Sequence, residues 1–112
     1  MPNRVRILLQ EYVAVVKKIY SGSLKKVLLY GSYARGDYSS ESDIDIMILV
    51  DVDEDEIKLK GHMLSDYTFD INYENDVKIM PIVQNEDFFI KWINAYSFFN
   101  NIANEGVELY AE

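Results

Sequence analysis

The segment VLLYGSYARGDYSSESDIDIMILV, residues 27–50, decides the fold of this chain. Its first part, Val27–Tyr30, is a short apolar run closed by Gly31, which predicts a buried strand. Residues 31–42 are small and polar and predict a loop, in which residues 33–35 could form one helical turn. The chain would then enter a second strand, so the segment predicts two strands joined by a polar loop.

The second predicted strand, residues 43–50, begins with two carboxylates. Because successive strand residues point to opposite faces, Asp43 and Asp45 should share a face, with their Cβ atoms roughly 6–7 Å apart. Oxygen ligands so placed can bind a hard cation such as Mg²⁺. Gly31, followed by Ser32, permits a tight turn whose backbone N–H groups can approach a phosphate closely. Taken alone, the two carboxylates could belong to a solvated acidic strand, and the Gly-Ser pair could be a common turn. Only the combination of the two motifs is specific.

The rest of the chain predicts helices and strands around these two strands. Pro81 falls within the next predicted strand and removes a backbone donor, which places that strand at an edge or a bulge. The order of elements predicts a small α/β or α+β fold in which helices pack against one sheet. Besides the two strands, we expect helices over residues 3–20, 57–75 and 86–99, a strand over residues 77–83, and a tail with a short helix near Ile102, a glycine turn and a final extended piece.

The composition indicates a globular protein. The 112 residues suit one domain, expected to span residues 1–112, with 49% hydrophobic and 27% charged residues. A formal net charge of −8 would repel a phosphate backbone, so nucleic acid is not an expected partner. The chain has no cysteine, which excludes disulfides, thiolate metal sites and cysteine nucleophiles. No apolar run approaches ~18 residues and no signal-peptide pattern opens the chain, so we expect a cytoplasmic protein without a membrane segment.

Two motifs in this sequence resemble those of one known family. Gly31–Asp37 reads Gly-Ser-Tyr-Ala-Arg-Gly-Asp, and Ser42–Asp45 reads Ser-Asp-Ile-Asp. The pattern is similar to the signature of the DNA polymerase β-like nucleotidyltransferases, and most similar to their minimal members, the MNT proteins of bacteria and archaea. The close match covers residues 30–50, and a looser one extends over most of the chain. The resemblance implies a mixed β-sheet flanked by helices, the palm-like nucleotidyltransferase fold.

The resemblance also implies a site, a reaction and a partner. In that family an acceptor attacks the α-phosphate of a nucleoside triphosphate, a nucleotide monophosphate is transferred and pyrophosphate leaves. MNT proteins are frequently encoded beside a HEPN-domain protein, so the implied function is transfer of AMP from ATP to a HEPN toxin, with this chain as the antitoxin. The residues implied are Asp43 and Asp45 as catalytic ligands of Mg²⁺, with two ions possible, and Gly31, Ser32, Arg35 and Ser42 as nucleotide-binding residues. For Arg35, a pair with Asp37 or Glu41 is an equal alternative.

The family usually places a third carboxylate on a later strand, and here three assignments stay open. Lys78 occupies the position that we align with that acid. Asp76 has the same strand parity and is our candidate for the third catalytic residue, whereas Asp70 on the preceding helix is more remote. If neither reaches the site, the chain could be a catalytically weak or inactive nucleotide-binding module that neutralises its partner by contact.

An aromatic cluster near the C-terminus predicts mainly core packing. It contains more aromatic side chains than one helix face can bury, so Phe98 and Phe99 are candidates for an interface, including one between copies of the chain. The cluster comprises Phe88, Phe89, Trp92, Tyr96, Phe98 and Phe99.

Overall fold

Four strands form one mixed sheet at the centre of the computed structural model, which describes all 112 residues. The strands are β1 (Leu24–Tyr30), β2 (Ile44–Val50), β3 (Ile79–Asn85) and β4 (Val107–Ala111), in the order β3-β2-β1-β4. The central strands β1 and β2 are antiparallel, β4 is antiparallel to β1, and β3 is parallel to β2. The predicted mixed sheet is therefore confirmed, and β3 with its Pro81 is an edge strand as expected.

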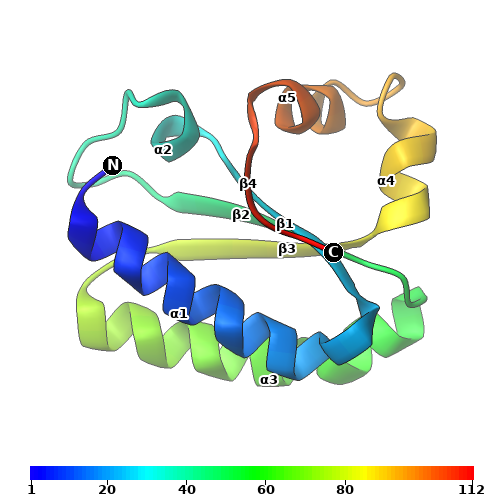
Figure 1. Cartoon of the computed structure of the whole chain (residues 1–112), viewed down its shortest axis with the longest axis horizontal. Helices are drawn as coiled ribbons and strands as arrows, with labels where there is room; N and C mark the ends of the chain where they lie inside the picture. Colours follow the sequence, from blue (N-terminus) through cyan, green and yellow to red (C-terminus); the bar gives the residue numbers. More distant parts are fainter.

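Helices cover both faces of this sheet (Figure 1). The two long helices, α1 (Asn3–Tyr20) and α3 (Glu54–Asn75), lie on one face. Two shorter helices, α4 (Glu86–Trp92) and α5 (Ser97–Glu105), lie on the other face, and the single turn α2 (Ser32–Arg35) follows β1. No helix is both long and apolar enough to cross a membrane.

Strand β2 is buried on both faces, which explains the continuous apolar run that follows Asp45. Ile44, Ile46, Ile48 and Val50 belong to the larger of two apolar clusters, together with residues of α1 and α3. Met47 and Leu49 belong to the smaller cluster, which α4 and α5 cover. The face that carries Met47 and Leu49 is also the face of Asp45, so helix packing buries one end of this face and leaves the carboxylate end free for a site.

The boundaries of the long helices follow from capping. Asp53 caps α3 by accepting a hydrogen bond from the Glu56 N–H at 3.0 Å, and the helix therefore begins earlier than the predicted residue 57. The acidic residues of the first turn favour the positive end of the helix dipole. Helix α1 spans residues 3–20 as predicted and ends at Ser21, whose φ of 53° breaks the helix.

The single helix predicted over residues 86–99 is wrong. The chain forms α4, turns at residues 93–96, where the N–H groups of Ala95 and Tyr96 both bond to the Trp92 carbonyl, and then begins α5. Both helices bury aromatic residues on the same sheet face, so the helical spacing continues across the break. Phe89 and Phe99 are core residues, whereas Phe98 is 46% exposed.

Candidate active site

The turn after β1 and the acidic start of β2 are in direct contact. Gly31 has φ 76° and ψ −154°, a backbone conformation essentially restricted to glycine. A Cβ atom at this position would collide with the carboxylate of Asp45. Tyr30, the residue before the turn, is the β-sheet partner of Asp45. The strand register therefore holds the turn against the carboxylate, and only glycine fits between them.

An open cavity of about 420 Å³ lies where these elements meet. It brings together all the sequence-predicted residues except Asp76. One wall comes from the turn and the two central strands, and the other comes from α5, which was not expected to contribute. The lining residues are Tyr30, Gly31, Ser32, Arg35, Ser42, Asp43, Asp45, Phe98, Asn101, Ile102 and Glu105.

The electrostatics of the cavity favour a bound cation. Burial, and then the negative charge of Asp43, raise the pKa of Asp45, and Arg35 opposes this with a smaller effect. Three carboxylates, those of Asp43, Asp45 and Glu105, face a single guanidinium among the lining residues. This excess of negative charge attracts metal ions, which can in turn bind an anionic nucleotide.

Arg35, the only cation in the cavity, is bound at its edge by two acids. Its guanidinium lies 3.3 Å from the Asp37 carboxylate and 3.3 Å from the Glu105 carboxylate. The hydrogen bond and charge of Asp37 are the main causes that raise the pKa of Arg35. Of the two alternatives in the sequence, pairing with Asp37 is present, and the second partner is Glu105 in place of Glu41.

Glu105 is a site residue that sequence analysis did not identify. Its Oε1 accepts a hydrogen bond from the Gly31 N–H at 3.1 Å as well as the contact from Arg35. The carboxylate thus ties the end of α5 to both ends of the glycine turn. The two partners are separated by 74 residues, so no local spacing could have predicted the contact. The only signal was a glutamate immediately before the glycine that ends the last helix.

The two serines of the predicted site play different structural parts. Ser32 is the first residue of α2, so its N–H has no acceptor within the helix, and both its N–H and its hydroxyl can face the cavity. Ser42 accepts a hydrogen bond from the Ser39 N–H at 2.9 Å, which closes the loop before β2. Ser32 is therefore the freer donor, and Ser42 mainly fixes the approach to Asp43.

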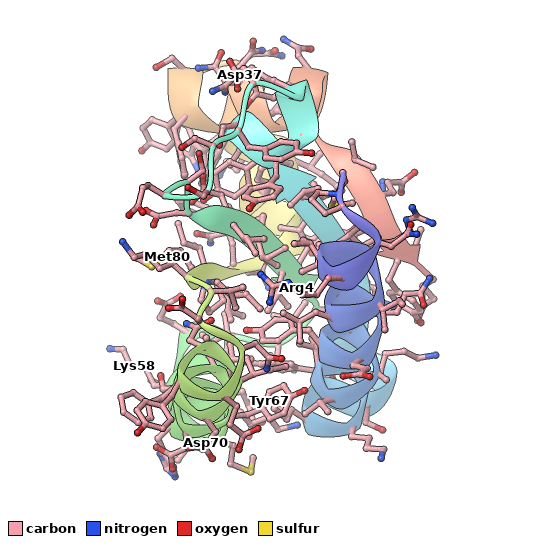
Figure 2. All side chains as sticks on the ribbon, turned by 90° about the vertical axis from the view of Figure 1, so that its left-hand side faces the viewer. Arg4, Asp37, Lys58, Tyr67, Asp70 and Met80 are labelled. Carbon is pink, nitrogen blue, oxygen red and sulfur yellow. The ribbon has the colours of Figure 1, made fainter.

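No third carboxylate reaches this cavity from α3 or β3. Asp76 ends α3 with φ 51° and lines a separate cavity of about 500 Å³ that also contains Lys78. Asp70 is exposed on α3, at the opposite end of the molecule from Asp37, as Figure 2 shows. The β2–β3 register places Met80 beside Asp45, and the Met80 side chain is 52% exposed. The β3 residue beside Asp45 is therefore apolar, whereas Asp76 and Lys78 precede β3 and line the other cavity.

The donor set suits a metal that also binds a nucleotide. Nowhere in the chain do three or more His, Cys, Asp or Glu side chains lie together so that they could hold a metal ion by themselves. Mg²⁺ is commonly bound by one or two carboxylates together with water and the phosphates of a substrate. Asp43 and Asp45 fit this arrangement, in which the phosphates complete the coordination. The metal role of the pair stays a prediction.

Comparison with known proteins agrees with the site. The family model described as a nucleotidyltransferase domain matches residues 9–102. Two proteins of Methanocaldococcus jannaschii, both provisionally named protein adenylyltransferases, are similar along nearly their whole length. One is 46% identical over 106 residues, 91% of this chain and 94% of the relative. The other is 34% identical over 102 residues, 91% and 95% of the two chains.

Solved structures support the same fold. A provisionally assigned nucleotidyltransferase from Sulfolobus solfataricus superposes with a TM-score of 0.56 at 19% identity, covering 96% of this chain and 83% of that one. A toxin–antitoxin complex with AMP-PNP gives a TM-score of 0.55 at 16% identity, covering 92% and 73%. The fold and the family match together define a nucleotidyltransferase domain.

This chain belongs to the nucleotidyltransferase family. Its chemistry is accordingly the transfer of a nucleotidyl group.

Proposed function

We propose that this chain is a Mg²⁺-dependent adenylyltransferase that transfers AMP from ATP to a HEPN-domain protein and thereby acts as an antitoxin. The observation that carries the proposal is the single cavity in which the Gly31–Ser32 turn adjoins Asp43 and Asp45. The names of the two M. jannaschii relatives support a protein as the acceptor. The toxin–antitoxin complex with AMP-PNP supports ATP as the nucleotide and a toxin as the partner.

The protein side chains bind and orient the nucleotide. Asp43 and Asp45 would hold Mg²⁺, which supplies neutralisation of phosphate charge when bound. The Ser32 N–H and hydroxyl donate hydrogen bonds to phosphate oxygens. Glu105 keeps the turn and Arg35 in place, and Arg35 presents its guanidinium at the rim of the cavity. Most of the rate acceleration in such a site comes from positioning and electrostatic stabilisation.

The transfer breaks a phosphoanhydride bond and forms a phosphoester bond. The acceptor hydroxyl oxygen forms a bond to the α-phosphorus, and the bond between this phosphorus and the oxygen bridging to the β-phosphate breaks. Pyrophosphate carries away the electron pair of the broken bond, and the hydroxyl proton is released to water. A protein with an exposed tyrosine, serine or threonine hydroxyl fits this chemistry.

The experiment uses ATP labelled in turn at the α- and the γ-phosphate, mixed with this chain, Mg²⁺ and a HEPN-domain protein from the same genome. We expect the partner to acquire label from the α-phosphate alone, because pyrophosphate removes the γ-phosphate. Asp43→Asn with Asp45→Asn should abolish labelling. Asp66→Asn with Asp70→Asn, two exposed acids of α3, is the matched control and should leave labelling unchanged. Label from both positions, or none with the folded wild-type chain, would overturn the proposal.

A second candidate function is favoured by the missing carboxylate on β3. With Met80 beside Asp45, the chain would bind a metal-nucleotide complex and neutralise its partner by contact alone. The Asp43→Asn, Asp45→Asn variant separates the two functions in cells that express the toxin. Growth should be lost with the variant if transfer is required, and retained if contact suffices.

A further inference from the structure

Helix α5 presents one continuous face to the candidate active site. Phe98, Asn101, Ile102 and Glu105 all line the cavity, and their spacing of three and four residues places them on the same side of the helix. Glu105 ends this face beside the glycine turn. Phe98 begins it two turns away, so α5 extends the site beyond the residues that would hold phosphates.

The Phe98 ring packs against Tyr30 but remains partly exposed to solvent. It is 46% exposed, whereas the adjacent Phe99 is only 8% exposed and belongs to the core. The Phe98 ring meets the Tyr30 ring edge to face, with centroids 5.7 Å apart and an interplanar angle of 83°. Tyr30 is itself buried, and this burial, with the charge of Asp45, raises its pKa to about 12. The buried Tyr30 thus lies between Asp45, its strand partner, and the Phe98 ring.

Asn101 adds a polar group one turn after Phe98. Its side chain is exposed and makes no hydrogen bond within the protein. Two other asparagines of α5 differ, because the Asn104 side-chain amide donates to the Asn100 side-chain oxygen Oδ1 at 2.9 Å. A free carboxamide carries both a donor and an acceptor, and such a pair can match one edge of a nucleobase.

We propose that Phe98 and Asn101 form the nucleobase subsite of this nucleotidyltransferase and select adenine. The inference rests on the proposed function, since it names the part of the nucleotide that α5 recognises. The base stacks on the open Phe98 ring, and the Asn101 carboxamide pairs with the adenine edge that carries the N6 donor and the N7 acceptor. Guanine presents two acceptors, O6 and N7, on the corresponding edge, so Asn101 satisfies only one of them.

The test is calorimetric binding of Mg²⁺ complexes of ATP, GTP and inorganic tripolyphosphate to the whole chain. Phe98→Ala should weaken ATP and GTP by about 5- to 100-fold, as expected for the loss of one stacked base. Asn101→Ala should weaken ATP at least 5-fold and GTP less, which reduces the preference for adenine. Tripolyphosphate has no base, so its affinity should be the same in the wild type and both variants.

Two exposed residues outside the cavity supply matched controls. Phe88→Ala removes a ring of similar exposure on α4, and Asn104→Ala removes a carboxamide of α5 that lies outside the cavity. Both should leave all three affinities unchanged. Equal affinity for ATP in Phe98→Ala and the wild type would overturn the subsite while leaving the proposed function intact. A parallel loss of tripolyphosphate affinity would also overturn it, since it would indicate a structural effect. A wild-type chain that binds none of the three would overturn both the subsite and the proposed function.

Discussion

Asp45 is a residue whose ionisation costs the fold some stability. Its pKa is raised by burial and by Asp43, so the folded chain binds a proton more readily than the unfolded chain. Between the ordinary and the raised pKa, the free energy of unfolding therefore falls as the pH rises, and above that window the loss is complete. We expect Asp45→Asn to raise the thermal midpoint at pH 7 and to weaken its dependence on pH. Thermal unfolding at several pH values checks this, and a lower midpoint for the variant at pH 7 would contradict it.

Gly31 is the second residue at which site geometry decides the outcome of a substitution. Gly31→Ala forces an alanine into a glycine-only conformation and pushes its Cβ against Asp45. We expect unfolding free energy to fall by about 1–3 kcal/mol and the affinity for MgATP to fall at least ~10-fold. Gly22→Ala is the control, because its Cβ would meet no atom within 4 Å and its effect should stay within about 0.5 kcal/mol. Chemical denaturation and calorimetry measure the two effects, and equal losses at both glycines would refute the explanation.

Local sequence patterns predict single strands and helices, but not the break between α4 and α5 or the register of the strands. The apolar run of β2 suffices to predict this strand, because each of its faces packs against a different helical layer. The break between α4 and α5 leaves no trace in the aromatic spacing, since both helices bury their rings on one sheet face. The β3 residue that lies beside Asp45 could be identified only from the register of the paired strands. It is Met80, whereas the sequence alignment pointed to Lys78, with Asp76 as the candidate acid of the same parity.

One buried polar contact lies between α1 and α3, and its two partners should contribute differently to the free energy of unfolding. The Tyr12 hydroxyl and the Thr68 hydroxyl lie 2.7 Å apart, and Thr68 also donates to the Leu64 carbonyl at 2.7 Å. Tyr67, which points from α3 toward α1 in Figure 2, stacks on the Tyr12 ring. Because Thr68 gives its one hydroxyl hydrogen to the Leu64 carbonyl, the Tyr12 hydroxyl donates to Thr68. Burial is the main cause that raises the pKa of Tyr12 to about 12.

This asymmetry gives a stability prediction for two conservative variants. Thr68→Val strands a hydroxyl donor on a fully buried tyrosine and should cost about 1–3 kcal/mol. Tyr12→Phe leaves Thr68 bonded to Leu64 and should cost less, about 0.5–1.5 kcal/mol. Urea unfolding of both variants gives the order of the two losses. A larger loss in Tyr12→Phe would contradict this prediction, since it would indicate that Thr68 depends on Tyr12 more than Tyr12 depends on Thr68.

Across the whole molecule, the site depends on segments far apart in the sequence. The turn and the acidic pair lie within residues 31–45, so their meeting could be predicted from one motif. Helix α5 reaches the same cavity only because β4, which follows it, returns to the sheet and pairs with the central strand β1. The contributions of Phe98, Asn101 and Glu105 arise from this topology, and no spacing within the sequence encodes them.

The net charge of −8 should make the stabilisation of this molecule by ATP depend on Mg²⁺. Free ATP meets the repulsion of Asp43, Asp45 and Glu105, and Mg²⁺ alone finds only two suitable carboxylates. Mg²⁺ neutralises the repulsion between ATP and the carboxylates, and the phosphates complete the coordination of Mg²⁺. The stabilisation by the two ligands should therefore be strongly cooperative. At about 100 times the Kd of MgATP, the gain should approach ~2.7 kcal/mol, or roughly 10 °C in the thermal midpoint, whereas Mg²⁺ or ATP alone should shift it by about 1 °C or less. The Asp43→Asn, Asp45→Asn variant should lose the cooperative shift, since it lacks the carboxylates through which the metal attaches the nucleotide. A shift of equal size with ATP and a chelator would mean that the phosphates bind through Arg35 and the turn alone, and that the acidic pair holds no metal.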